Sequence, residues 1–257
     1  MDILPPSLHA KTMLKNLLRT IAQRLLGLQH YLLVFSWLSA LRLRKTASGR
    51  EFRHFISLIP EAGLILDLGA NIGITTITLA KARPGCRILA FEPIPVSRRA
   101  LMKLTEWHRL KNVTVLPYAL GNKNQTVQMT MPRVAGALMP GLSHISEAAE
   151  AKAILFDADM RVLDELNELN DVGNMIAIKL DVENYEYYVL SGAMHILRQH
   201  QPVIYCELWN DERRRQCIDL LQAIGYRTRV FQHDRLVEYE GQDSINFFFL
   251  PSSMKTR

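Results

Sequence analysis

Short apolar runs alternate with amphipathic segments along most of the chain. Runs of four to seven residues that are rich in Val, Ile, Leu and Phe predict buried strands at residues 64–68, 87–91, 113–116, 175–180, 203–208, 227–231 and 245–251. Apolar residues at three- and four-residue steps predict helices at residues 48–59, 74–81, 96–109, 186–199 and 211–224. This alternation predicts an α/β fold with a doubly wound, seven-stranded, Rossmann-like sheet.

The regular alternation loosens between residues 126 and 163. The sequence there predicts inserted strands around a flexible loop, from the stretches "VQMTMP", "GALMPGLSHISEAAEA" and "ILFDADMRVL". Irregular insertions of this length in compact domains are usually functional or mobile. His144, within "GLSHIS", is therefore a candidate for a lid over a bound ligand, and an ordinary exposed loop histidine is the alternative.

The basic residues are concentrated near the N-terminus. The whole chain holds 31 Lys and Arg against 25 Asp and Glu, a net charge of +6. Residues 1–60 hold nine Lys and Arg against two acidic residues, or +7, so the remainder holds 22 against 23, or −1. A near-neutral body lacks the cationic stripe that binds phosphates, and we expect no nucleic-acid partner.

Residues 1–60 predict a basic, amphipathic helical extension in front of a main domain at residues 61–257. Apolar residues recur at helical spacing over residues 13–28, with cations on another face. The charge-free run of residues 25–41 is short for a bilayer span and contains polar residues, so neither a span nor a secretory signal is expected. Two alternatives stay open: these helices pack on the body or a partner, or they lie on an anionic membrane surface.

A glycine-containing turn follows the first strand of the main domain in "LILDLGANIGITTITLA". A dinucleotide fingerprint needs three glycines, whereas this turn has Gly69 and Gly73 alone, and no phosphate-loop Gly-Lys-Ser/Thr follows. We expect Asp67, at the strand end, to point into the pocket, repel a phosphate and attract a cation. Glu92 ends the next strand, where a carboxylate can accept both ribose hydroxyls. The expected ligand has a cationic amino-acid end, a ribose and no phosphate, as S-adenosylmethionine does.

Five motifs between residues 64 and 208 occur in a fixed order: "DLGANIG", "FEPIP", "YALGN", "IKLDVENYEYYVLSGA" and "PVIYCELWN". In order and spacing they resemble the FkbM-type S-adenosylmethionine-dependent methyltransferase family, and "NFFFLP" resembles the family's closing strand. The resemblance implies a class I methyltransferase sheet with S-adenosylmethionine as cofactor. It also implies these cofactor contacts: Asp67, Gly69, Asn71 and Gly73 around the methionine half, Glu92 at the ribose, and Ala119, Leu120 and Gly121 beside the adenine.

The chain departs from the family pattern at two of these motifs. Asn184 stands where the family usually has glycine after "DVE", which puts the local turn in question, although Asn tolerates positive φ best after glycine. Trp209 stands where the family often has histidine. A catalytic histidine is therefore not carried over to this position.

Charged residues end the fourth and fifth predicted strands, at the edge where doubly wound sheets bind ligands. On an extended strand Lys179, Asp181 and Glu183 share a side, so Lys179 can pair with Asp181 and tune its carboxylate. We expect Asp181 to act as a base or to orient the acceptor, with Glu207 as the second candidate, and structural ion pairs are the alternative. No obligatory metal is expected, while a Mg²⁺ ion that bridges acceptor and carboxylates stays open.

The resemblance implies O-methylation of a hydroxyl on a sugar, a glycolipid or a secondary metabolite. The basic N-terminus suits a lipid-linked acceptor and peripheral membrane contact, and the competing class is an inactive methyltransferase fold that binds a membrane or protein partner. Cys86, Cys206 and Cys217 are too few and scattered for a disulfide framework. We expect them to be reduced packing residues in a cytoplasmic protein, with membrane association left open.

Overall fold

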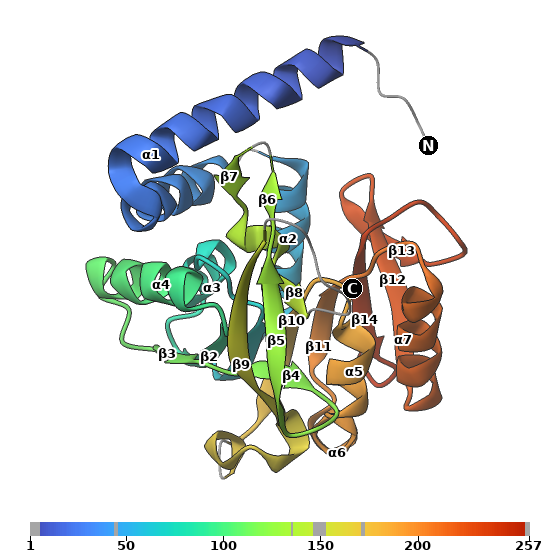
Figure 1. The fold of residues 1–257 in the computed structure, drawn as a ribbon. Coiled ribbons are helices and arrows are strands. Elements are labelled where there is room, and N and C mark those ends of the chain that lie inside the picture. Colours follow the sequence, from blue (N-terminus) through green and yellow to red (C-terminus); the bar gives the residue numbers. More distant parts are fainter. Residues whose placement is uncertain (1–5, 44–45, 135, 146–152, 171–172, 255–257) are drawn as a thin grey trace.

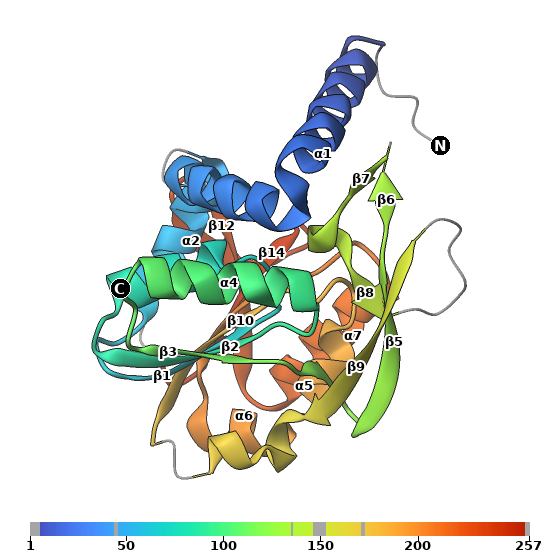
Figure 2. The same cartoon turned by 60° about the vertical axis from the view of Figure 1, so that its left-hand side comes forward.

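The structure is a computed structural model that describes residues 6–43, 46–134, 136–145, 153–170 and 173–254. Parts of the predicted N-terminal extension and of the predicted insertion, including residues 146–152, lie outside the described residues. Figures 1 and 2 show a central sheet with helices on both faces, a second small sheet beside it, and a long bent helix across one end.

The main sheet contains eight strands in the order β13-β12-β14-β11-β10-β1-β2-β3. The strands β3, β2, β1, β10 and β11 are parallel, and β14 pairs antiparallel with β11. Their bounds are β1 Gly63–Leu68, β2 Cys86–Phe91, β3 Val113–Leu116, β10 Met175–Leu180, β11 Val203–Glu207, β12 Tyr226–Gln232, β13 Arg235–Glu238 and β14 Asn246–Pro251. The predicted doubly wound, Rossmann-like class I sheet is confirmed.

The eighth strand, β13, was not predicted from the sequence. It pairs antiparallel with β12 at the edge of the sheet. The two strands are joined through His233 and Asp234, whose φ angles are 50° and 59°. Tight hairpin turns need such positive φ angles and usually use Gly or Asn for them, so this turn lacks the ordinary signal.

Helices cover both faces of the sheet: α2 Ala47–Leu58, α3 Ile74–Ala82, α4 Pro95–Trp107, α5 Glu186–Ser191, α6 Met194–His200 and α7 Glu212–Ala223. Phe55 of α2 and Leu79 of α3 are buried in one core cluster with Ile65 and Ile88 of the sheet. The helices α5, α6 and α7 share another cluster with alternate sheet residues. Since both faces are covered, the central strands are apolar along most of their length, as parallel sheets usually are, and the charged exceptions include Asp67 in β1 and Lys179 in β10. The three cysteines are free and buried, as predicted.

The single helix predicted at residues 186–199 is divided into α5 and α6. The reason lies at Gly192, where a Cβ atom would stand 2.2 Å from the carbonyl oxygen of Gly121 in β4. The chain breaks its helix there to pass against the backbone of the neighbouring strand. A close approach of two backbones carries no periodic signal in the sequence.

Helix α1, Pro6–Leu43, includes both predicted N-terminal helical segments and bends sharply at Gly27 (Figure 2). Gly27 has φ 71° and ψ 153°, a conformation that favours glycine. The second half packs on the body: Leu32 is buried, and the buried Ser36 hydroxyl donates to the Ile72 carbonyl at 2.9 Å. None of the described helices has the length and apolar character needed to cross a bilayer.

The segment between β3 and β10 builds the second sheet, in the order β4-β9-β5-β8, and a short hairpin, β6–β7. The bounds are β4 Ala119–Gly121, β5 Gln125–Met131, β6 Arg133–Val134, β7 Ala137–Leu138, β8 His144–Ile145 and β9 Ile154–Val162, with 3₁₀ turns η1 Pro140–Leu142, η2 Leu163–Glu165 and η3 Asn167–Leu169. This insertion brings η1 and β8 next to the carboxyl ends of the main strands (Figure 1).

Candidate active site

The turn between β1 and α3 lies tightly against the end of β10. Gly69 has a φ angle of 78°, and a Cβ atom there would stand 1.8 Å from the Asp181 carbonyl oxygen. Gly73, at φ 88°, caps α3, and a Cβ there would stand 2.6 Å from Leu101 Cδ1. Both glycines are thus required by the fold itself, independently of any ligand.

The Asp67 carboxylate lies beneath this turn and lines neither of the two cavities described below. It is fully buried, and its Oδ2 accepts hydrogen bonds from the hydroxyls of Thr76 at 2.7 Å and Thr75 at 3.1 Å. The expectation that Asp67 points into the pocket therefore differs from the structure. Its neighbour in the sheet register is Lys179, and both side chains face the α3 side of the sheet. The predicted contact with a cofactor stays a prediction.

Lys179 connects the buried acid to the open edge of the sheet. Its ammonium lies 3.5 Å from Asp67 Oδ1 and 3.4 Å from Asp181 Oδ2, and it donates to the Gly69 carbonyl at 2.8 Å. Burial alone would lower the pKa of Lys179, but the carboxylates of Asp181 and Asp67 outweigh it and raise that pKa. The predicted pairing of Lys179 with Asp181 is present, and the cation fixes the carboxylate's position.

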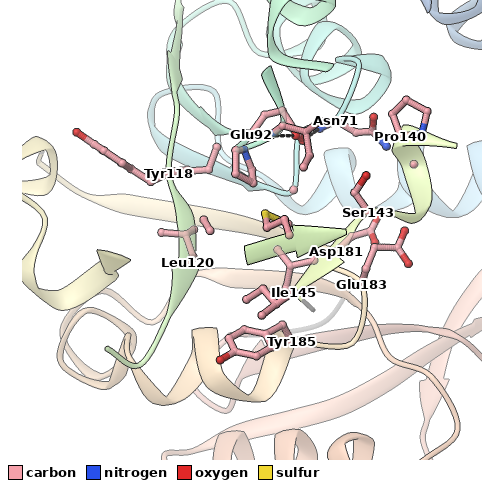
Figure 3. A pocket seen from close by; sticks show the side chains of 18 residues that line it. Asn71, Glu92, Tyr118, Leu120, Pro140, Ser143, Ile145, Asp181, Glu183 and Tyr185 are labelled. Carbon is pink, nitrogen blue, oxygen red and sulfur yellow. Dashed lines mark hydrogen bonds between the residues drawn. The ribbon is translucent and has the colours of Figure 1, made fainter. Parts of the chain in front are cut away.

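Glu92, at the end of β2, is held in place by backbone amides. Its Oε2 accepts a hydrogen bond from the Asn71 N–H at 2.8 Å (Figure 3). Its Oε1 accepts one from the Ile94 N–H at 2.8 Å. Burial raises the pKa of Glu92 to about 7, although the two amides, Lys179 and Arg98 oppose the rise. Each carboxylate oxygen keeps a free lone pair, so Glu92 can still accept hydroxyl donors from a ligand.

A first cavity opens at the carboxyl ends of β1, β2, β3 and β10 (Figure 3). It encloses about 680 Å³ free of protein atoms, its open mouth included. Its walls contain these predicted site residues: Gly69, Asn71, Glu92, Ala119, Leu120 and Asp181. Residues far apart in the sequence thus meet at one site, as the strand-end rule predicts.

The polar atoms of this first cavity include two without a partner. Asn71 Oδ1 and Ser143 Oγ are buried, and neither has a hydrogen-bond partner in the structure. A buried polar atom of this kind costs free energy unless a ligand or water satisfies it. An acceptor oxygen at Asn71 beside the carboxylates suits the ammonium group of an amino acid, so the residues present fit S-adenosylmethionine.

The chain leaves extended geometry directly after Asp181. Glu183 has φ 56° and Asn184 has φ 67°, so the extended strand that would align Glu183 with the Lys179–Asp181 pair does not continue to Glu183. The Asn184 geometry agrees with the expectation that Asn replaces a family glycine at positive φ. Asp181 and Glu183 both line the first cavity, and burial together with the Asp181 charge raises the pKa of Glu183 to about 8.

The other two candidates, Glu207 and His144, do not line the first cavity. Glu207 ends β11 opposite Asn246, and burial and the Asp181 charge raise its pKa, but it does not belong to the lining of that cavity. His144 lies between two lining residues, Ser143 and Ile145, with its ring Nδ1 3.0 Å from the Leu142 carbonyl. Among the described residues, no cluster of three His, Cys, Asp or Glu side chains has the geometry to hold a metal ion.

Sequence reasoning missed most of one wall of the first cavity. The insertion supplies Pro140, Gly141, Ser143 and Ile145, and α5 begins next to Tyr185, which closes the lower side (Figure 3). A Cβ on Gly141 would stand 3.1 Å from Asn71 Nδ2, so the insertion reaches the β1–α3 turn. The Pro-Gly pair was the available signal, since it marks a turn in the insertion.

The sheet order and the cavity at its carboxyl edge define the class I methyltransferase fold. The family model for the methyltransferase FkbM domain matches residues 67–238, which is 172 of 257 residues, and the chain therefore belongs to this family.

Named relatives and one solved structure are similar over part of this chain. "Methyltransferase 1" of Beauveria bassiana (strain ARSEF 2860) is 25% identical over 151 residues, covering 53% of this chain and 61% of the relative. "Methyltransferase sdnD" of Sordaria araneosa is 30% identical over 149 residues, covering 57% and 52%. The chain thus spans about half to three fifths of the length of these curated relatives. The crystal structure of methyltransferase FkbM from Methylobacillus flagellatus KT has a TM-score of 0.48 and 17% identity, covering 74% of this chain and 44% of that one.

Proposed function

We propose that the protein is an S-adenosylmethionine-dependent methyltransferase that acts on a hydroxyl of a small molecule, a sugar or a lipid-linked acceptor. The observation that carries the proposal is the lining of the first cavity, which offers carboxyl oxygens as acceptors and, among the described residues, no cationic side chain. Its described lining includes Glu92, Asp181 and Glu183 and contains no Lys or Arg. Such a lining offers no cation to the pyrophosphate of a dinucleotide, and it offers hydrogen-bond acceptors to a ligand that carries an ammonium group.

The residues of the first cavity divide into parts that suit the parts of this cofactor. Glu92 would accept hydrogen bonds from the ribose hydroxyls, and Asn71 Oδ1 would accept one from the ammonium group. Tyr118, Ala119 and Leu120 present a largely apolar surface for the adenine. These protein groups follow successive strands along the sheet edge: Asn71 follows β1, Glu92 follows β2, and Tyr118 to Leu120 follow β3.

When bound, S-adenosylmethionine supplies the methyl group as part of a sulfonium. The chain's own contribution is to hold the acceptor hydroxyl in line with that group and to take its proton. We assign this proton to Asp181, because its carboxylate lines the cavity and lies 3.4 Å from the Lys179 ammonium, which supports its position. Lys179 also offsets negative charge as the hydroxyl is deprotonated.

The first half of α1 adds a proposed location for the acceptor. Its exposed apolar residues face away from the body: Leu17, Leu18, Ile21, Leu25 and Leu26. With the basic residues of the same segment, they suit contact with an anionic membrane surface. This favours the lipid-linked form of the acceptor.

Calorimetric titration with S-adenosylmethionine and, separately, with NAD⁺ tests the proposed function. We expect micromolar binding of the first and none of the second. Glu183→Lys should weaken S-adenosylmethionine binding at least about tenfold by placing a cation in the first cavity. Glu106→Lys, which makes the same change on the exposed side of α4, should leave it unchanged. Binding of NAD⁺ alone, or equal S-adenosylmethionine affinity in both variants, would overturn the proposal.

A further inference from the structure

A second cavity adjoins the first one on the α1 side of the molecule. It encloses about 1000 Å³ free of protein atoms, its open mouth included. The two cavities share wall residues at the β1–α3 turn, the insertion and the end of β10: Gly69, Asn71, Pro140, Gly141 and Asp181. A molecule in the second cavity would therefore meet a molecule in the first one beside Asp181.

The walls of the second cavity are mostly apolar. Helix α1 contributes Tyr31, Leu32 and Phe35. Ile72 of the β1–α3 turn, Ile74 at the start of α3 and the segment around η1 add further apolar side chains. A hydroxyl-rich ligand such as a free sugar would lose its hydrogen bonds to water here and find few replacements. An apolar ligand body would instead gain from the contact.

One cation on α1 faces this apolar space. Arg19 is partly buried, lies 5.9 Å from the centre of the Phe35 ring and makes a long contact of 3.4 Å with Asn16 Oδ1. Within the described part of the chain, no carboxylate lies within ion-pair distance of its guanidinium. A partly desolvated guanidinium without a carboxylate favours an anionic group on a ligand.

The α1 wall is fixed to the body on both sides of its bend. The Gln23 side chain makes two hydrogen bonds with the backbone of Leu138, both at 2.9 Å. On the other side of Gly27, the Ser36 hydroxyl binds the Ile72 carbonyl at 2.9 Å. These contacts join α1 both to the insertion and to the β1–α3 turn, so the second cavity has a defined shape.

We propose that the second cavity is the acceptor site and that it selects a mainly apolar acceptor carrying an acidic group, which Arg19 binds. The inference rests on the proposed methyl transfer, because that function places the cofactor in the first cavity. It narrows the acceptor class from hydroxyl compounds in general to amphiphilic ones, and it excludes free sugars.

Titration calorimetry on the full chain saturated with S-adenosylmethionine tests the proposal with three probes: decanoate, decan-1-ol and methyl glucoside. We expect decanoate to bind about tenfold more tightly than decan-1-ol, since an ion-paired hydrogen bond contributes about that much, and methyl glucoside not to bind. Arg19→Gln should abolish the preference for the acid. Arg24→Gln removes the same charge from an exposed position of α1 and should keep the preference.

A second pair of variants locates the probe. Leu142 lines the second cavity but not the first, so Leu142→Trp should block decanoate and leave S-adenosylmethionine affinity unchanged. Leu155→Trp, at an exposed position of β9, should change neither decanoate binding nor S-adenosylmethionine affinity. If S-adenosylmethionine binds but decanoate does not, or if Arg19→Gln keeps the preference, the acceptor proposal is wrong while the proposed function stands. If S-adenosylmethionine itself does not bind, the proposed function fails first.

Discussion

Lys179 lies between two carboxylates of the site, the buried Asp67 and the partly exposed Asp181. Its side chain is 5% exposed and that of Asp67 is 0%, whereas that of Asp181 is 35% exposed. Removing one partner of a buried ion pair leaves an uncompensated charge at a cost of about 3–5 kcal/mol. Loss of ligand binding in an Asp67 variant would thus not by itself identify a cofactor contact. Of the three charged residues Asp67, Lys179 and Asp181, Asp181 is the one with the most exposed side chain, and a ligand in the first cavity can reach it.

Glu183 gives the site a pH dependence whose direction is fixed by its surroundings. Its pKa is about 8 in the folded protein, above the ordinary 4.5, because burial and the Asp181 charge disfavour the carboxylate. Between these values the folded state holds a proton that the unfolded state has lost. The contribution of Glu183 to the free energy of unfolding is therefore complete below pH 4.5 and is lost as the pH rises towards 8.

We expect Glu183→Gln to remove this loss, because the amide cannot ionise. Its melting temperature should match that of the wild type near pH 5 and exceed it by about 4 °C near pH 8.5. This corresponds to about 1–2 kcal/mol once solvent screening of the partly exposed side chain is allowed for. Thermal unfolding of the ligand-free protein over this pH range measures it. Glu106→Gln, on the exposed face of α4, is the control, and a constant difference across the range would contradict the prediction.

The β1–α3 turn is the element on which both cavities depend, since Gly69 lines each of them. Gly69→Ala should destabilise the protein by at least about 3 kcal/mol, because the new Cβ would meet the Asp181 carbonyl oxygen at 1.8 Å. Gly173→Ala is matched in conformation, at φ 71°, but has nothing within 4 Å, so it should cost about 1 kcal/mol. Urea unfolding of both variants separates the effect of the steric clash from that of the backbone conformation. Equal losses of unfolding free energy in the two variants would contradict the clash at Gly69.

Helices and strands that follow a hydrophobic periodicity were predicted from the sequence. Breaks and turns that depend on tertiary contacts were not. The strand predicted at residues 175–180 coincides with β10, because its apolar run is bounded by polar residues. The break between α5 and α6 depends on Gly121 meeting Gly192, and β13 depends on a hairpin without glycine.

The candidate site divides in the same way between strand ends and the insertion. Strand-end residues such as Glu92 and Asp181 were found from the strand-end rule. Ser143 was missed because an insertion wall is placed by tertiary packing, which leaves no fixed spacing in the sequence.

At the scale of the whole molecule, the first half of α1 has an unusual distribution of side chains. Its inner face carries polar residues: Asn16 and Thr20 are buried, and Gln23 binds Leu138. Its outer face carries Leu18 and Leu25, which are 57% and 80% exposed. A water-facing helix normally has the opposite arrangement. Such an outer face, on the most basic segment of the chain, is what contact with an anionic lipid surface needs.

Co-sedimentation of the full chain with vesicles tests this contact. We expect binding to vesicles that contain phosphatidylserine, weaker binding to vesicles of phosphatidylcholine alone, and a decrease with salt. The double variant Leu18→Ser and Leu25→Ser should lower the bound fraction at least about fivefold, since each leucine contributes roughly 1–2 kcal/mol when buried in lipid. Leu155→Ser with Ile245→Ser removes similarly exposed apolar side chains outside α1 and should leave binding unchanged. Protein that binds S-adenosylmethionine yet ignores anionic vesicles would restrict α1 to its role as a wall of the second cavity.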